Sequence, residues 1–188
     1  MRCEGMLSFE DVLFDSTSIE VVLYTRVEES AVGRFPDCNI GWKTTEKRYY
    51  FGRKLHLSCM PNGTLLNFRL TAASLSDHKG FAKLNNTKID KVTCDSGYQG
   101  EKGFAGQAIS LTKPWGQSQH QRFLNGKRVT IEQVFNVLKE LGLEERLKLK
   151  NSRSLGSHLL SVLTCFLAIQ YTNLKKGLSP LAYGRFLL

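Results

Sequence analysis

Two β-rich runs joined by an Asn-Gly turn constrain the fold more than any other feature of the chain. Residues 49–59 and 64–72 are rich in aromatic and branched side chains, and Pro61, Asn62 and Gly63 lie between them. Asn and Gly both tolerate positive φ, which tight hairpin turns require. The sequence therefore predicts an antiparallel pair of strands here.

Further strands and helices are expected on both sides of this hairpin. The expected elements are strands at 7–15, 89–94 and 107–112, a short helix at 75–84, a helical turn at 99–104, and longer helices at 127–141 and 155–174. Residues 22–48 contain several breakers and predict a long loop that orders on a ligand. The order of strands and helices indicates one α/β domain with a mixed sheet.

Composition narrows the class of protein. With 188 residues and 41% hydrophobic content, the chain can bury the core of one domain. Lys and Arg number 26 against 17 Asp and Glu, and this charge of +9 favours a polyanionic partner such as nucleic acid. Five scattered cysteines without a C-x-x-C pair favour a reducing cytoplasm over a disulfide framework or zinc site. The polar interruptions of residues 155–171 predict neither export nor a membrane span.

Three acidic residues stand where a metal site could form. Asp15 closes the first predicted strand, Asp95 follows the strand at 89–94, and Glu132 lies on the helix at 127–141. Mg²⁺ prefers oxygen ligands, and two such ions roughly 3.5–4 Å apart activate an attacking oxygen and stabilise a leaving one. A single acid at a strand end is more often solvated or capping, so the flanking residues decide between these readings.

Short motifs flank all three acids. Asp95 begins the motif D-x-G-Y, and Asp15 begins Asp-Ser-Thr-Ser-Ile. Arg128, Glu132 and Lys139 have the spacing R-x3-E-x6-K, which puts all three on one side of a helix. These motifs, with the Tyr, Gly, Lys, Leu and His of residues 49–57, resemble bacterial insertion-sequence DDE transposases over residues 7–174.

The resemblance implies an RNase H-like DDE catalytic domain at residues 1–174, followed by a C-terminal tail at 175–188. It implies that Asp15, Asp95 and Glu132 hold two Mg²⁺ or Mn²⁺ ions. With these ions the domain is expected to cut double-stranded DNA at the ends of the element and to join it to target DNA. A homo-oligomer in the bacterial cytoplasm, at the nucleoid, is expected for the active form. The short interval between Asp95 and Glu132 indicates the compact branch without a large β-rich insertion.

Two features depart from the family pattern. Asn125 stands where a tyrosine is expected three residues before Arg128. The chain also begins close to the first strand, without room for the N-terminal helical DNA-binding region of such enzymes. A truncated copy is therefore expected.

Six residues are candidates for DNA contact. They are Arg128, Lys139, Lys54, Arg53, Lys113 and Trp115. Guanidinium groups grip phosphate with two hydrogen bonds, an ammonium supplies a point charge, and a tryptophan face can stack on an unpaired base. Solvated surface charges and a packing tryptophan are the plainer alternatives. A basic cluster at residues 43–54, interleaved with aromatic side chains, also suits DNA or a solvated hairpin face.

Two other functions stay open at this stage. One is a catalytically inactive remnant that only binds DNA through its basic surface. The other is an RNase H-like nuclease that acts on RNA–DNA hybrids. Metal-dependent nicking of DNA and a substrate panel would separate them from a transposase.

Overall fold

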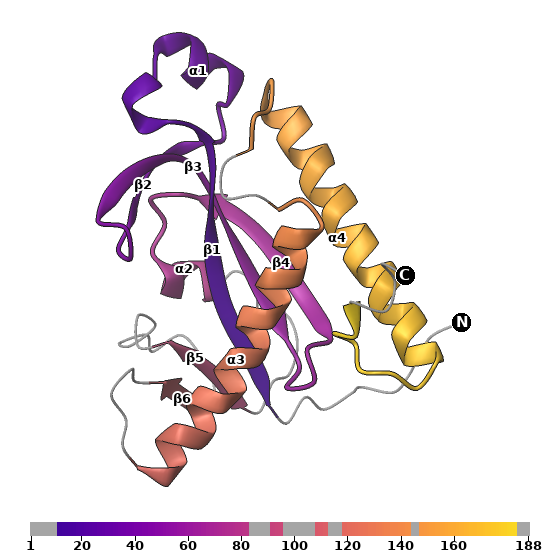
Figure 1. Ribbon diagram of the computed structural model, residues 1–188. Helices are drawn as coiled ribbons and strands as arrows, with labels where there is room; N and C mark the ends of the chain where they lie inside the picture. Colours follow the sequence, from indigo (N-terminus) through magenta and orange to yellow (C-terminus); the bar gives the residue numbers. More distant parts are fainter. Residues whose placement is uncertain (1–10, 83–90, 96–107, 113–117, 144–146, 184–188) are drawn as a thin grey trace.

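A computed structural model of the chain describes residues 11–82, 91–95, 108–112, 118–143 and 147–183 (Figure 1). The elements in order are β1 (Val12–Val22), the 3-10 turn η1 (Tyr24–Arg26), α1 (Glu29–Arg34), β2 (Asn39–Lys43), β3 (Arg48–Cys59), β4 (Leu65–Ala72), α2 (Asp77–Ala82), β5 (Lys91–Asp95), β6 (Ala108–Thr112), α3 (Gln119–Glu140) and α4 (Ser152–Lys175). The expected helical turn at 99–104 lies outside the described residues.

The strands form one mixed sheet in the order β2-β3-β1-β5-β6, and β4 also pairs with β3. β1 runs antiparallel to β3, whereas β5 is parallel to β1 and β6 is parallel to β5. β2 pairs with the first part of β3 and β4 with the rest, so the long β3 has two successive neighbours along one edge. The predicted mixed sheet with an antiparallel hairpin is confirmed.

The hairpin between β3 and β4 turns where the sequence predicts. Gly63 has φ +89°, a conformation that a residue with a Cβ rarely adopts. Its amide donates to the Met60 carbonyl, and the Asn62 side chain accepts from the Thr64 amide at 3.0 Å. Local turn chemistry therefore fixes the pairing of the two strands.

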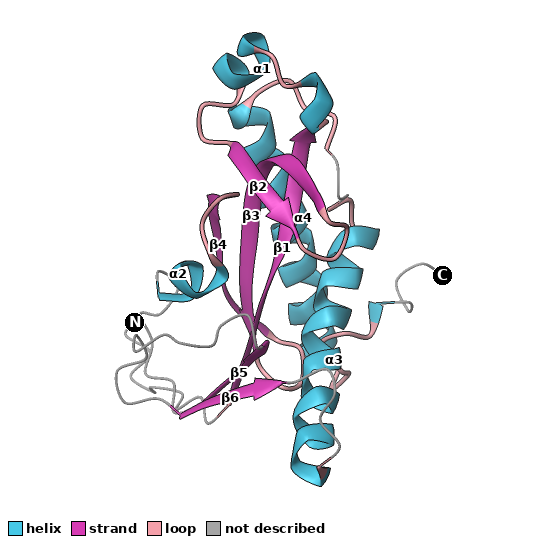
Figure 2. Ribbon diagram, turned by 90° about the vertical axis from the view of Figure 1, so that its left-hand side faces the viewer, coloured by secondary structure: helices cyan, strands magenta, loops and turns pink. Residues whose placement is uncertain are grey.

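Helices cover both faces of the sheet: α3 and α4 lie on one face and α2 on the other (Figure 2). Side chains alternate along a strand, so Leu13 and Ile19 of β1 join Leu55 and Leu57 of β3 in the core beneath α3 and α4. On the opposite face Phe14 stacks on His56, and Gly80 of α2 lies against the same His56 ring. β1 thus sends odd-numbered residues toward α3.

α3 ends where its sequence predicts, but it begins at Gln119 rather than at the predicted Lys127. Gly142 has φ +108°, its amide donates to the Lys139 carbonyl, and the Leu143 amide donates to the Leu138 carbonyl. This is a Schellman motif, which satisfies carbonyls that the last turn leaves without helical partners. The buried stripe of α3 consists of Ile131, Val134, Phe135 and Leu138.

α4 is long and apolar enough to cross a membrane by length and composition alone. One of its faces packs into the core through residues such as Leu159 and Phe166, and Leu160 and Tyr171 are exposed. The absence of a membrane span therefore stays a prediction.

Two further sequence expectations are wrong. The first strand does not end at Asp15 but continues to Val22, because β3 pairs with it from Leu13 onward and satisfies the backbone of its polar middle. Residues 22–48 are not one long loop: they contain η1, α1 and β2, and β2 is held by its pairing with β3.

Candidate active site

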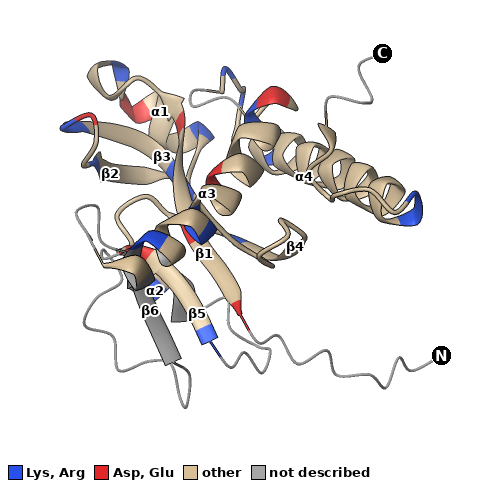
Figure 3. Ribbon diagram, turned by 60° about the horizontal axis from the view of Figure 1, so that its bottom comes forward, with Lys and Arg blue, Asp and Glu red and all other residues tan. Residues whose placement is uncertain are grey.

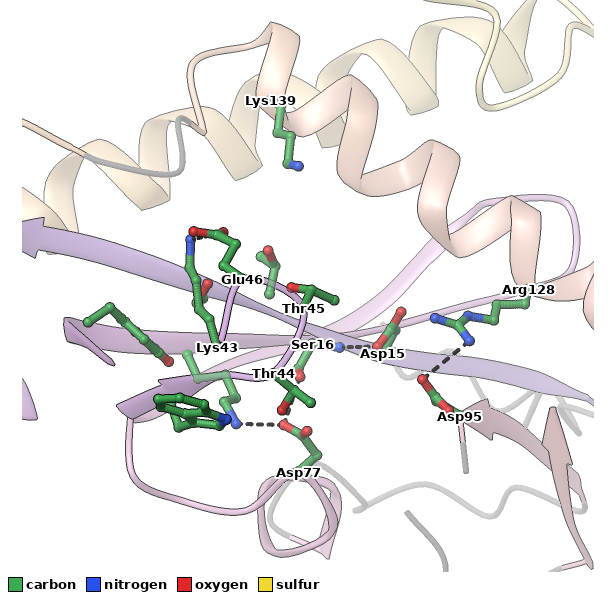
Figure 4. Close-up of a pocket in the computed structure, with 15 residues that line it drawn as sticks. Asp15, Ser16, Lys43, Thr44, Thr45, Glu46, Asp77, Asp95, Arg128 and Lys139 are labelled. Atoms are coloured by element: carbon green, nitrogen blue, oxygen red, sulfur yellow. Dashed lines mark hydrogen bonds and ion pairs between the residues drawn. The ribbon is translucent and has the colours of Figure 1, made fainter. Parts of the chain in front are cut away.

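A polar pocket of about 570 Å³ opens along the middle of β1 (Figure 4). Its walls come from β1, the turn between β2 and β3, the start of α2, the end of β5, and α3. The charged residues that line it are Asp15, Lys43, Glu46, Lys54, Asp77, Asp95, Arg128 and Lys139. Charges of both signs therefore gather in one solvent-accessible space.

Asp15 and Asp95 reach this pocket from neighbouring parallel strands. Val12 of β1 is in register with Val92 of β5, and Leu13 with Thr93. The same register carried two residues further sets Asp15 beside Asp95, with both side chains on one face of the sheet. β5 ends at Asp95 while β1 continues, which gives the pocket its place at the carboxyl end of β5.

The Asp15 carboxyl is in a costly environment for a negative charge. Burial raises its pKa from 3.8 to about 6, and the like charges of Asp95 and Asp77 act in the same direction. The Ser16 amide, which donates to Asp15 Oδ1 at 2.8 Å, and the Arg128 guanidinium oppose this rise in pKa. A cation beside Asp15 would relieve the cost.

Arg128 joins the two other predicted acids. Its Nη1 lies 3.2 Å from Asp95 Oδ2, and its Nε lies 3.2 Å from Glu132 Oε1 one helical turn away. Glu132 does not line the pocket, and its side chain is 52% exposed. The structure therefore brings Asp15 and Asp95 together in the pocket and links Glu132 to them through Arg128.

Of the basic residues predicted to contact DNA, three line the pocket: Arg128, Lys139 and Lys54. Lys139 comes from the last turn of α3 and points toward the pocket (Figure 4). Lys54 Nζ donates to Asp77 Oδ1 at 2.8 Å and to the Leu75 carbonyl at 3.1 Å. Arg53 instead donates to the Leu70 carbonyl at 3.5 Å. Lys113 and Trp115 lie outside the described residues, as do Ser96, Gly97 and Tyr98 of the D-x-G-Y motif.

Sequence reasoning missed the part that Asp77 takes in this pocket. Asp77 lies at the start of α2, and its Oδ1 accepts from Ser16 Oγ at 2.8 Å as well as from Lys54. This contact ties α2 to β1 directly beside Asp15. The Ser-Thr-Ser run after Asp15 was the only sequence signal for this contact. These hydroxyl groups lie within a strand that continues to Val22, where they need hydrogen-bond partners from other elements.

His56, the histidine of the motif at residues 49–57, is buried behind the pocket. Its Nε2 lies 2.9 Å from Thr71 Oγ1, and burial lowers its pKa to about 4. The ring is therefore neutral at physiological pH and packs beneath β1.

Among the described residues, no group of three or more His, Cys, Asp and Glu side chains is arranged as a ready metal site. The chemistry of the pocket nevertheless fits a hard divalent cation, since carboxylate oxygens of Asp15 and Asp95 share it and burial penalises the charge on Asp15. Asp15 and Asp95 would hold the ion. Glu132 could join them as a metal ligand only if its side chain left Arg128 and turned toward the ion.

The chain matches the family model of the transposase DDE domain over residues 8–168. The chain belongs to this family. A search of curated proteins and a search of solved structures each found no match. DDE transposase domains have the RNase H-like fold, act on DNA and generally use divalent metals, so the fold expected from the sequence motifs is confirmed. Basic segments of this DDE domain occur on α3 where that helix crosses the sheet (Figure 3).

Proposed function

We propose that this DDE domain cuts and joins DNA at the ends of an insertion sequence in a metal-dependent reaction. The observation that carries the proposal is that Asp15 and Asp95 share one pocket with Arg128 and Lys139. Carboxylates and cations in one open pocket suit a reaction at a phosphodiester, whose oxygens need counter-charge while the attacking and leaving oxygens need activation.

The reaction has two displacements. In the first, water attacks phosphorus at the element end, the bond to the 3′ oxygen breaks, and the proton of water passes to that oxygen to give a 3′-hydroxyl. In the second, this 3′-hydroxyl attacks a phosphodiester of the target, and a 3′-hydroxyl of the target leaves. Divalent ions, when bound, would polarise the attacking and leaving oxygens.

The residues of the chain have separate roles in this scheme. Asp15 and Asp95 would hold the metal ions, and Glu132 would complete the set after it parts from Arg128. Lys139 and the released Arg128 would hold phosphate oxygens, which fixes the scissile bond against the carboxylates. Lys54 holds Asp77, and Asp77 holds the Ser16 hydroxyl. These contacts keep in place the Ser16 amide, which donates to the Asp15 carboxylate.

The finer points of the proposal follow the family pattern. The ions are Mg²⁺ or Mn²⁺, two in number, and the substrate is duplex DNA at element ends and target. Arg53, Lys113 and Trp115 extend the DNA surface beyond the pocket. The active form is a homo-oligomer, and it works at the nucleoid in the bacterial cytoplasm.

A substrate panel tests the reaction class. The purified chain is incubated with Mg²⁺ or Mn²⁺ and with duplex DNA, an RNA–DNA hybrid and single-stranded RNA of the same sequence. Metal-dependent cuts in duplex DNA that leave 3′-hydroxyl ends support the proposal. Cleavage of the RNA strand of the hybrid alone would make the domain an RNase H-like nuclease. If the chain binds DNA but cuts none of the substrates with either metal ion, it is a catalytically inactive remnant that only binds DNA.

A further inference from the structure

Three exposed aromatic side chains form a cluster, and one of them, Trp42, lines the pocket. Tyr24, Trp42 and Tyr49 are 43%, 48% and 52% exposed. The Trp42 and Tyr49 ring centroids lie 4.8 Å apart in an edge-to-face arrangement, and the Tyr24 and Tyr49 centroids lie 5.5 Å apart. We call these three residues the aromatic cluster.

The sheet register explains why the cluster is exposed. Trp42 of β2 pairs directly with Tyr49 of β3, so both side chains leave the sheet on the same face. Their neighbours Gly41 and Tyr50 are buried on the other face. The aromatic cluster therefore faces solvent beside the core, and packing in the core does not account for these three rings.

The cluster is continuous with the catalytic pocket. Trp42 lines the pocket that contains Asp15 and Asp95, and it also lines a second hollow of about 300 Å³. Tyr49 and Lys54 line that second hollow, and Lys54 borders both spaces. A chain of nucleotides with its phosphate at Asp15 would thus share this pocket with the exposed ring of Trp42.

We infer that the aromatic cluster is a stacking site for an unpaired base of the DNA next to the scissile phosphate, with Trp42 as its principal surface. The inference rests on the proposed function and adds a substrate class, namely DNA with at least one unpaired base at this point. Aromatic faces stack on any base, but a base inside a duplex has its own faces covered. Trp42 lines the same pocket as Arg128 and Lys139, whose positive charges match the DNA backbone, and this favours nucleic acid over an apolar protein partner.

Binding of fluorescent DNA tests this inference. The probes are a blunt duplex and the same duplex with a single-stranded extension, both titrated in EDTA so that no cutting occurs. Trp42→Ala should weaken binding of the extended probe roughly 5- to 100-fold, as expected for one lost stacking contact, and change blunt-duplex binding less than about twofold. Trp42→Phe, which keeps a ring, should retain most of the affinity. The slope of log affinity against log salt should stay unchanged, because stacking releases no counterions.

Tyr171→Ala is the matched control, since Tyr171 is a 64% exposed aromatic residue on α4 away from the pocket. A second readout places 2-aminopurine in the extension, where stacking on Trp42 should quench its fluorescence in the parent but not in Trp42→Ala. Equal losses on both probes, or no loss, or no quenching in the parent, would overturn the inference. A parent that cuts duplex DNA but shows no Trp42 effect refutes the stacking site alone. Selective stacking without any cutting refutes the proposed reaction alone, and a parent that binds neither probe refutes both.

Discussion

Arg128 of α3 lies 3.2 Å from Asp95 at the end of β5, and the same guanidinium lies 3.2 Å from Glu132. One cation therefore bridges two of the three acids proposed as the DDE residues, on two different elements. In the metal-free protein this contact offsets part of the repulsion among the carboxylates at the pocket. A divalent cation bound by these oxygens would have to displace Arg128 from them.

The first prediction follows from that competition. Arg128→Ala should lower the Mn²⁺ concentration at which the thermal unfolding midpoint begins to rise, by roughly three- to tenfold for a partly solvated charge. Thermal unfolding across a Mn²⁺ titration measures it. Lys148→Ala is the control, because Lys148 is exposed and does not line the pocket, and it should leave that concentration nearly unchanged. A rise in the required concentration for Arg128→Ala would mean that Arg128 supports metal binding instead.

The second prediction concerns pH and Asp15. The folded-state pKa of about 6 lies above the ordinary 3.8, so folding favours the protonated carboxyl. The stability linked to Asp15 is then fully present below about pH 4 and is lost as the pH rises through about 6. Asp15→Asn carries no charge, so in EDTA it should be more stable than the parent above the folded pKa, by on the order of 2 kcal/mol.

Urea unfolding of both proteins on either side of this pH window measures the effect. The advantage of Asp15→Asn should shrink toward the acidic end. Asp37→Asn, at an exposed carboxylate, is the control and should show no such pH-dependent gain. A variant less stable than the parent at both ends of the window would show that the carboxylate itself supports the fold.

The third prediction separates phosphate contacts from metal ligands. Lys139→Ala and Arg128→Ala should each reduce the slope of log DNA affinity against log salt by about 0.9, the value for one lost phosphate contact on duplex DNA. Glu132→Ala should leave affinity nearly unchanged or raise it, because a negative charge is removed. A salt titration of duplex binding gives all three slopes. Unchanged slopes for both basic variants would make Arg128 and Lys139 ordinary surface charges.

The fold was predictable where local chemistry decides it. The Asn62-Gly63 turn and the apolar stripe of α3 each carry their own signal. The hairpin strands and the end of α3 lie within a residue or so of the predicted bounds, whereas α3 begins at Gln119, well before the predicted start at Lys127. β2 was not predictable, because its residues include breakers and it is held by pairing with β3 rather than by propensity. The continuation of β1 past Asp15 was missed for the same reason, since its polar run is stabilised by a distant neighbour.

The candidate site divides in the same way. Short motifs located Asp15, Asp95 and Arg128, which the structure brings together around one pocket. The spacing of Glu132 to Arg128 predicted a shared helix side, but it could not show that the two charges pair with each other. The contact of Asp77 with Ser16 joins residues 61 positions apart and has no local signal.

A fourth prediction tests whether the ion pair between Arg48 of β3 and Glu20 of β1 stabilises the sheet. Arg48 donates to both carboxylate oxygens of Glu20, at 3.2 and 3.0 Å, and the Glu20 side chain is only 2% exposed. Arg48→Ala leaves that charge buried without this partner and should cost about 2 kcal/mol of unfolding free energy, since Arg48 itself is partly solvated. Urea unfolding measures the loss, and Lys148→Ala at an exposed position serves as control. Adding Glu20→Gln should recover part of the loss, and a cost no larger than that of the control would contradict the role of the pair.

The most direct test of the metal-dependent DNA reaction is a strand-nicking assay on duplex DNA with Mg²⁺ or Mn²⁺. It compares the parent with Asp15→Asn, Asp95→Asn and Glu132→Gln, each checked for folding by urea unfolding and for duplex binding. We expect nicking by the parent that stops in EDTA, no nicking by any of the three variants, and retained DNA binding by all of them. Nicking by the parent that persists in EDTA, or in any one of the three folded variants, would contradict the account.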